Sequence, residues 1–198
     1  MRLKKGDGFS MRIAACQLYA DIYARLAQPE RESVHAEFKE LCADDTPMVR
    51  WGAAQAISVL CEHVGSVQIC EFILPLLKEL LNDKNDSVKV HAVTSSVNVV
   101  KHVKEISKIQ EQILPALKQA YQNRQSWRLR FAVAESGALI GSSLPKGNVD
   151  QSIIPIYTTL LGDSEPEVRS EAAAKLPLLA KHCSPNFVTS KILPSLKL

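Results

Sequence analysis

The fold is decided by a short stretch, Asp44-Asp45-Thr46-Pro47-Met48-Val49-Arg50, whose last two residues recur along the whole chain. A hydrophobic residue followed by a basic one returns every 38 to 41 residues, at Met11-Arg12, Val49-Arg50, Val88-Lys89, Leu129-Arg130 and Val168-Arg169. A second pair keeps a similar spacing, at Leu74-Pro75, Leu114-Pro115, Ile154-Pro155 and Leu193-Pro194. A period of this length is typical of a stacked array rather than a closed globule. Such arrays usually present a long surface to other macromolecules.

Each hydrophobic–basic pair begins an amphipathic helix. Apolar or small residues follow its first member at helical spacing, as Ala53, Ile57, Leu60, Cys61 and Val64 follow Val49. The residue four positions on is small in most copies, which lets neighbouring helices approach closely. The stripe that starts at Leu129 is weaker because it contains Gly137 and Gly141. These two glycines predict either a close helix contact or a less stable repeat, since each costs about 1 kcal/mol against alanine.

The first half of each repeat is predicted to be a helix with an internal proline. Residues 69–82 and 109–122 show apolar i, i+3, i+4 spacing around Pro75 and Pro115. A proline inside a helix removes one hydrogen bond and should kink it. The helical segments predicted from these patterns are residues 9–26, 30–43, 46–64, 67–82, 86–103, 106–122, 126–142, 149–161, 166–182 and 187–198. We expect no strand.

The spacing predicts one elongated domain over residues 1–198. Residues 1–26 are expected to supply the second helix of a partial repeat, and residues 184–198 to begin a further one. The full repeats are predicted at residues 27–64, 65–103, 104–145 and 146–183. We expect a fragment of a longer scaffold or a truncated relative, because a stacked array needs polar end caps and neither end resembles one. Apolar end faces also predict end-to-end self-association.

Composition excludes several classes of function. Hydrophobic residues make up 46% of the chain and aromatic residues 6%, so the core should be mainly aliphatic. A net charge of +3 falls short of the dense positive field expected of a nucleic-acid binder. We expect no signal peptide and no membrane span, because the N-terminus is polar and no apolar run is long enough. Five cysteines without a C-x-x-C pair predict a cytoplasmic setting, with a nuclear one also open.

We find no pattern that predicts catalysis, a cofactor or a metal. None of the five histidines pairs with a cysteine or histidine at usual ligand spacing. No serine or cysteine is placed as a nucleophile beside a base. The glycines between Gly137 and Gly147 do not form a phosphate-binding loop. The sequence therefore favours a protein that is not an enzyme.

Helix pairs with a proline, an acidic turn and a Val-Arg pair resemble HEAT repeats. Five runs extend the resemblance to the scaffolding (A) subunits of protein phosphatase 2A, in the order of their middle N-terminal repeats: Gly6 to Arg12, Leu41 to Arg50, Asp86 to Lys89, Ser126 to Arg130 and Glu167 to Arg169. The D-D-T-P-M-V-R and S-W-R-x-R runs are the specific ones. The resemblance implies an all-α HEAT-repeat α-solenoid with about four full repeats and partial repeats at both ends.

The same resemblance implies a non-catalytic scaffold that binds a regulatory (B-type) phosphatase subunit through the turns inside each repeat. The family's catalytic subunit docks on C-terminal repeats that have no counterpart in this chain. The expected partner-binding residues are Asp7, Phe9, Ser10, Asp45, Thr46, Pro47, Met48, Trp51, Asp86, Ser126, Trp127, Arg128, Ser164 and Glu165. Polar members could instead be ordinary capping residues, and Trp51 and Trp127 could pack between repeats. Gly8 and Trp51 depart from the family pattern, which puts the choice of partner in doubt.

A second set of residues is expected to hold the repeats together. An acidic residue stands eight positions after the proline slot, and a basic residue ends each hydrophobic–basic pair. We expect these to form a structural ladder of Asp44, Asp83 and Asp163 with Arg50, Lys89, Arg130 and Arg169, paired within the same repeat or with the next. The basic residues could instead contact a partner directly. Arg128 is outside that register, which favours a binding role for it.

Two other functions remain open from the sequence. The chain could be a HEAT-repeat adaptor of another system, such as nuclear transport or chromosome organisation, although the two specific runs argue against it. A nucleic-acid-binding HEAT-like enzyme would need a basic concave face and a catalytic acid. The nearly balanced charge disfavours that class.

Overall fold

A computed structural model describes residues 8–195 of the chain. This part consists of helices and the turns between them, without a strand, as the sequence predicts. Two compact units divide the chain between Lys108 and Ile109. We call Met1–Lys108 unit 1 and Ile109–Leu198 unit 2 and describe each by itself. The repeat boundaries inferred from the sequence stay predictions.

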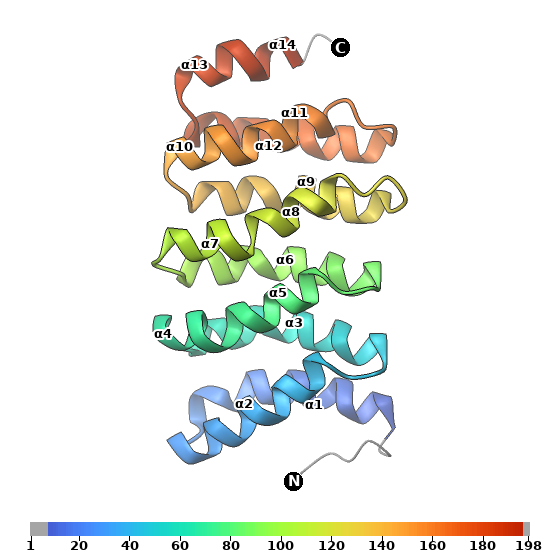
Figure 1. Ribbon diagram of the computed structural model, residues 1–198, viewed down its shortest axis with the longest axis vertical. Coiled ribbons are helices and arrows are strands. Elements are labelled where there is room, and N and C mark those ends of the chain that lie inside the picture. The colour runs from blue at the N-terminus through green and yellow to red at the C-terminus, as the bar shows by residue number, and fades with distance from the viewer. Residues whose placement is uncertain (1–7, 196–198) are drawn as a thin grey trace. The chain divides into compact units, whose positions relative to one another are not determined.

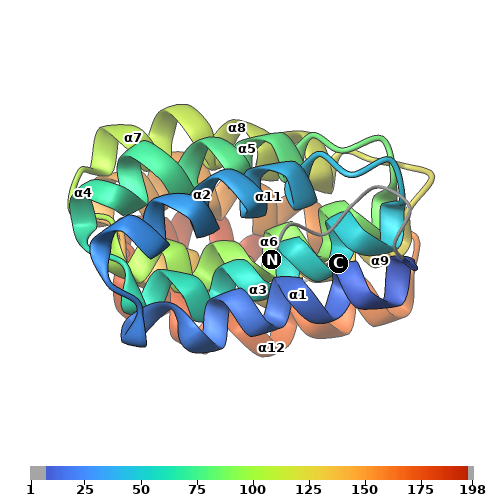
Figure 2. The same cartoon turned by 90° about the horizontal axis from the view of Figure 1, so that it is seen from below.

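Unit 1 has two layers of helices. The helices that start at a hydrophobic–basic pair, here called marker helices, are α1 (Phe9–Ile22), α3 (Pro47–His63) and α6 (Asp86–His102). They pack side by side, α1 on α3 and α3 on α6. The second layer holds the outer helices, and Figures 1 and 2 show it along one face of the marker helices. Its elements are α2 (Gln28–Cys42), α4 (Ser66–Gln68), the π-helical η2 (Ile69–Ile73) and α5 (Leu74–Leu81). The 3-10 turn η1 (Tyr23–Arg25) connects α1 to α2.

Unit 2 repeats the arrangement. Its marker helices α9 (Trp127–Ser142) and α12 (Pro166–His182) pack together, and outer helices contact each of them. The outer elements are α8 (Leu114–Tyr121), α10 (Lys146–Asn148), η3 (Val149–Ile153), α11 (Ile154–Leu160), α13 (Pro185–Phe187), η4 (Val188–Ile192) and α14 (Leu193–Ser195). Helix α7 (Ile106–Gln112) spans the division between the units.

The recurring prolines interrupt the outer helices. Pro75 and Pro155 are the second residues of α5 and α11, and a π-helical turn directly precedes each of these segments. Because proline has no N–H, it cannot donate to the carbonyl four residues earlier, and the backbone before it is free to widen. Helix α2 carries Ala36 at the same slot and runs unbroken over its 15 residues. At this slot the proline therefore goes with the interruption, whereas Pro177 lies inside α12 without dividing that helix.

The two glycines of α9 serve a close contact. A Cβ atom on Gly137 would lie 3.2 Å from Cε2 of Tyr157, and one on Gly141 would lie 3.4 Å from Ile153. The Tyr157 hydroxyl donates to the Ala134 carbonyl and accepts from the Ala138 N–H at 2.8 Å. The hydroxyl thus bridges two backbone groups of α9, and Gly137 gives the ring the room to reach them.

The cysteines are free thiols that pack as small hydrophobic residues. Cys16, Cys42, Cys61 and Cys183 are buried, and Cys70 is half-buried. Burial raises the pKa of Cys16 and of Cys61 to about 12. These thiols are therefore protonated and poorly reactive near neutral pH.

Candidate partner-binding surface

Arg50 joins two consecutive turns of unit 1. Its Nε and Nη2 atoms donate to Oδ2 and Oδ1 of Asp83 at 2.6 and 2.9 Å. Its Nη1 atom donates to the backbone carbonyl of Asp44, in the turn before its own helix, at 2.7 Å. Both charged side chains are only 8% exposed. One guanidinium therefore fixes the turn before α3 to the turn before α6.

Arg130 makes the same contacts in unit 2. Its Nε and Nη2 atoms donate to Asp163 at 2.6 and 2.8 Å, and its Nη1 atom donates to the carbonyl of Asn123 at 2.8 Å. Arg12 reaches Asp44 through Nε at 2.8 Å, so unit 1 holds a second pair of this kind. We call these three Arg–Asp pairs the rungs. Each links the arginine of one repeat to the aspartate of the next.

The outcome for the predicted ladder is mixed. Arg50, Arg130, Asp44, Asp83 and Asp163 all belong to rungs. The pairing of Arg12 escaped the sequence analysis, although its place in the first hydrophobic–basic pair was the signal for it.

Two predicted ladder members differ from the rungs. Lys89 bonds instead to Asp86 of its own helix, with Nζ 2.6 Å from Oδ1. The residue 40 positions after Asp83 is Asn123, an amide, so the sequence offers no aspartate at that slot. Arg169 donates from Nη1 to the carbonyls of Asp163 and Ser164, which reproduces only the own-turn half of a rung.

The rungs stabilise the charged form of the aspartates. Burial alone raises the pKa of Asp83, but hydrogen bonds from the Arg50 guanidinium and from the Asn85 N–H outweigh it and lower the pKa. Asp163 has the same balance, with Arg130 and the Glu165 N–H as its donors, and its pKa is also lowered. Each rung carboxylate is therefore ionised at neutral pH.

The turns share one hydrogen-bond pattern. Asp83 Oδ1 accepts from the N–H two residues on, that of Asn85, at 2.8 Å. Asp44, Asp163 and Asn123 accept in the same way at 2.8, 2.9 and 3.0 Å. Such side-chain-to-backbone bonds give a turn a defined shape. Asn123 keeps this bond because an amide oxygen also accepts, and this role of the slot was missed in the sequence.

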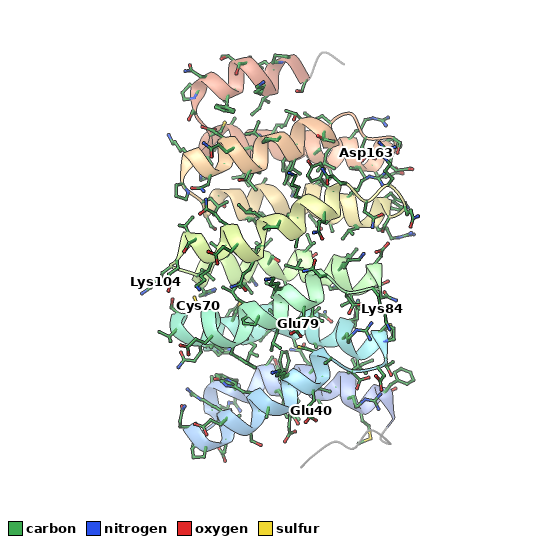
Figure 3. The ribbon with its side chains drawn as sticks, viewed as in Figure 1. Glu40, Cys70, Glu79, Lys84, Lys104 and Asp163 are labelled. Atoms are coloured by element: carbon green, nitrogen blue, oxygen red, sulfur yellow. The ribbon has the colours of Figure 1, made fainter. Side chains whose placement is uncertain are left out.

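The turns before α3 and α6 and the first residues of these two helices lie on one side of unit 1, as Figure 1 shows, and Lys84 marks this side in Figure 3. Met48, the second residue of α3, is 47% exposed there. Trp51 is half-buried, with its ring edge-on to His91 at 4.8 Å between centroids. Trp51 thus packs between two repeats, which was the alternative to a binding role for this residue.

Unit 2 presents an aromatic and basic cluster at the start of α9. The Arg128 guanidinium lies 4.7 Å from the centre of the Trp127 ring, and Phe131 approaches that ring edge-on at 6.4 Å. Arg128 is exposed. A hollow of about 580 Å³ between the two turns of this unit is lined by Tyr121, Gln122, Arg124, Arg130, Thr159, Gly162, Asp163 and Ser164. Figure 3 labels Asp163 in the turn before α12.

The other expected partner-binding residues differ in exposure. The exposed ones are Phe9, Ser10, Asp45 and Ser164, and the half-buried ones are Thr46, Pro47, Asp86, Ser126 and Glu165. Several have structural contacts: Thr46 Oγ1 accepts from Arg12 at 3.2 Å, and Ser126 Oγ accepts from the Leu129 N–H at 3.4 Å. Asp7 lies outside the described residues. Met48 and Arg128 are thus large, exposed side chains. Each lies next to a turn that a rung arginine holds in place.

Two further properties of the described part of the chain bear on other functions. Residues 8–195 contain no group of three or more His, Cys, Asp or Glu side chains that could hold a metal ion. Over the same residues, every helix is too short or too polar to cross a membrane.

Comparison with known proteins gives two family matches. Residues 10–127 match the model described as PIK3R4-like, middle domain, and residues 146–198 match the model described as PPP2R1A-like HEAT repeat. Among solved structures, Cex1p superposes with a TM-score of 0.67 and 13% identity over 88% of this chain and 35% of its own. A computationally designed armadillo repeat protein gives 0.62 and 19%, over 96% and 89%. Together these matches confirm the predicted HEAT-type fold class.

Curated relatives carry phosphatase names. The regulatory (A) subunit of protein phosphatase PP2A from Schizosaccharomyces pombe is 29% identical over 150 residues, which cover 73% of this chain and 25% of the relative. A probable PP2A regulatory subunit of Caenorhabditis elegans is 33% identical over 96 residues, 48% of this chain and 16% of the relative. The aligned parts thus span a quarter or less of these relatives. The resemblance to the scaffolding subunit expected from the sequence is confirmed.

Proposed function

The chain belongs to the family described as PIK3R4-like, middle domain, and we propose that it is a non-catalytic scaffold that holds protein subunits against its turns. Its curated relatives are named as regulatory or scaffold subunits of protein phosphatase 2A. The finer proposal is that the turns bind a regulatory (B-type) subunit of such a phosphatase. A catalytic subunit would be held by repeats outside this chain. The free, buried cysteines favour a reducing compartment, the cytoplasm or the nucleus.

The observation that carries the proposal is the combination of rungs and exposed side chains at the same turns. Arg50 binds the turn before α3 and the turn before α6 at once. Met48, two residues before it, is 47% exposed. A surface that is already fixed loses less conformational entropy when a partner binds. The turns are therefore preorganised while the side chains beside them stay available.

In unit 2 the residues with the strongest binding chemistry are Trp127 and Arg128. Tryptophan and arginine are the side chains most enriched among residues that dominate interface energies. The stacked pair offers an apolar face and a charge at one place. We propose that a partner carboxylate pairs with the Arg128 guanidinium while an apolar side chain covers Trp127.

A pull-down of the tagged chain with purified regulatory and catalytic phosphatase subunits tests the proposal. We expect the chain to capture the regulatory subunit but not the catalytic one. Affinity should fall at least about tenfold for Trp127→Ala and for Met48→Glu, as for residues central to an interface. Val67→Glu is the matched control for Met48→Glu. Val67 is 63% exposed but lies in α4, beyond the C-terminal end of α3, whereas Met48 lies at the start of that helix, which is about 25 Å long.

Equal capture by all three variants would remove the turns from the proposal. No capture of any phosphatase subunit by the folded wild-type chain would instead favour a HEAT-repeat adaptor of another system. That alternative has its own support, because the longer family match, over residues 10–127, is not the phosphatase one.

A further inference from the structure

A groove runs between the outer helices of unit 2. Its first part is a hollow of about 570 Å³ between α8 and the segment from η3 to α11, lined by Gln110, Leu114, Pro115, Lys118, Tyr121, Gln151, Ser152, Pro155 and Ile156. The hollow of about 580 Å³ between the two turns continues it, because Tyr121 lines both. We call the two hollows together the outer groove. From Gln110 to Arg124 it follows the helix for roughly 20 Å, at about 1.5 Å per residue.

The first part of the outer groove has an apolar floor. Leu114 and Ile156 are buried in it, and the rings of Pro115 and Pro155 are exposed beside them. Tyr121 adds a half-buried ring where the two hollows meet. This floor offers apolar contacts to the side chains of an occupant.

Two exposed amides lie at one end of the same hollow. The side chains of Gln110 and Gln151 line it and have no hydrogen-bond partner among residues 8–195. An amide side chain offers both donors and an acceptor. It can therefore bond to the N–H and C=O groups of an extended backbone, which need partners when they leave water.

The outer groove carries unpaired positive charge. Its charged lining residues are Lys118, Arg124, Arg130 and Asp163, and the last two form a rung. Lys118 and Arg124 are exposed, and their side chains have no ion pair or hydrogen bond within the described part of the chain. The two free cations of this lining therefore favour an occupant with carboxylates.

Unit 1 differs at the corresponding positions. Lys78 stands 40 residues before Lys118 and is followed by Glu79, whereas Lys118 is followed by Gln119. In α11 the same slot holds Thr159, which lines the groove. Figure 3 labels Glu79 of α5 together with Glu40, the acidic residue at this slot of α2. Acidic residues thus accompany the lysines of this row in unit 1, and neutral ones replace them in unit 2.

We propose that the outer groove binds an extended acidic segment of a partner protein, in which glutamate or aspartate alternates with apolar residues. Successive side chains of an extended chain point to opposite sides, so the apolar ones meet the floor while the carboxylates face Lys118 and Arg124. About six residues span the groove at roughly 3.3 Å each. This site goes beyond the proposed scaffold function, because it recognises a linear segment rather than a folded subunit.

Fluorescence anisotropy with the full chain tests the proposal. The probe is a fluorescein-labelled, C-terminally amidated peptide, Glu-Leu-Glu-Val-Glu-Leu-Glu. We expect saturable binding that weakens as salt is added, because exposed charges are screened. The same peptide with glutamine in place of every glutamate should bind about tenfold more weakly, since two exposed ion pairs are lost. Absence of saturable binding by the wild-type chain, or equal binding of the two peptides, would overturn the proposal.

Charge reversals at matched positions locate the binding site. Lys118→Glu and Arg124→Glu should each weaken binding of the acidic probe about fivefold, because a repulsion replaces an exposed ion pair. Lys78→Glu and Lys84→Glu make the same charge changes 40 residues earlier, in unit 1, and should leave the affinity unchanged. All four positions are exposed, so each variant should keep the helical circular dichroism of the wild type. Equal weakening by the unit 1 variants would refute the assignment to the outer groove.

A further variant separates this site from the surface that is proposed to hold a phosphatase subunit. Trp127 does not line the outer groove. Trp127→Ala should therefore bind the acidic probe like the wild type, although it is expected to weaken capture of the regulatory subunit. Loss of probe binding in Trp127→Ala would contradict the separate site, whatever the result of the pull-down.

Discussion

Arg50 and Lys89 occupy the same position in consecutive repeats of unit 1 and behave differently. Arg50 bonds to Asp83 in the following turn, and both side chains are 8% exposed. Lys89 bonds to Asp86, three residues earlier in its own helix, with exposures of 20% and 41%. The basic charge is common to both, so charge alone does not make a link between repeats.

The difference teaches that the rung depends on the shape of the guanidinium. Its planar fork donates to both oxygens of one carboxylate and still has an atom left for the Asp44 carbonyl. An ammonium group is a point charge on a flexible stem and cannot span two turns in this way. A carboxylate must also stand in the following turn. Both conditions hold for Arg12, Arg50 and Arg130.

Acid should produce the largest effect, because it acts on all three rungs together. The pKa of Asp44, Asp83 and Asp163 is lowered in the folded protein. The rung contribution is therefore complete above the ordinary aspartate pKa of about 3.9 and is lost as the pH falls through the lower folded-state value. Urea titrations between pH 7 and pH 3 should show this decline, and Asp83→Asn should make it shallower. An identical decline in that variant would contradict the role of Asp83.

Removing one carboxylate should have the next largest effect. Asp83→Ala leaves the buried Arg50 guanidinium without its main partner and breaks the bond to the Asn85 N–H. We expect a loss of about 3 kcal/mol in the free energy of unfolding, as when one member of a buried ion pair is removed. Urea-induced unfolding followed by circular dichroism measures it. Glu40→Ala, at an exposed acid of α2, is the control, and an equally small loss in both variants would sink the idea.

Arg50→Lys gives unit 1 two lysines at this position and isolates the shape of the group. It keeps the charge but loses the second donor to Asp83 and the bond to the Asp44 carbonyl. The loss should be about 2 kcal/mol, within the range of one hydrogen bond that involves a charged group. The same titration measures it, and wild-type stability in this variant would mean that charge, not shape, makes the rung.

Lys89→Ala should have the smallest effect. Its bond to Asp86 joins partly exposed groups within one helix, and such pairs contribute about 0.5 kcal/mol or less. The midpoint of urea unfolding should therefore stay close to that of the wild type, also at low salt. A loss as large as that of Asp83→Ala would show that Lys89 has a structural role of its own.

Much of the fold could be predicted from residue spacing, because each helix repeats the same apolar pattern. The predicted helix over residues 46–64 is observed as Pro47–His63. The consequence of Pro75 was predicted as a kink, and the structure shows a π-helical turn before it. Residue spacing could not predict the π-helical turn, because the turn depends on which backbone carbonyl accepts from each N–H. Near the proline, the ring blocks the carbonyl four residues earlier.

The candidate site was less predictable. The ladder register left two partners open for each arginine, the aspartate of its own repeat and that of the next. Only the structure shows that Arg50 bonds to the backbone of its own turn and to the side chain of the next one. Trp51 looked like a binding residue by its turn position, yet it packs on His91, a residue 40 positions away. Contacts between repeats depend on helix rotation, which a one-dimensional pattern does not fix.

The reactivity of each buried thiol depends on how often the helices around it separate. Cys16, Cys42 and Cys61 lie in unit 1, whereas Cys183 lies in unit 2. A thiol that is buried and protonated reacts with an alkylating reagent only when the surrounding helices separate. The alkylation rate of each cysteine, read by mass spectrometry, would therefore report how often its own part of the chain opens under native conditions.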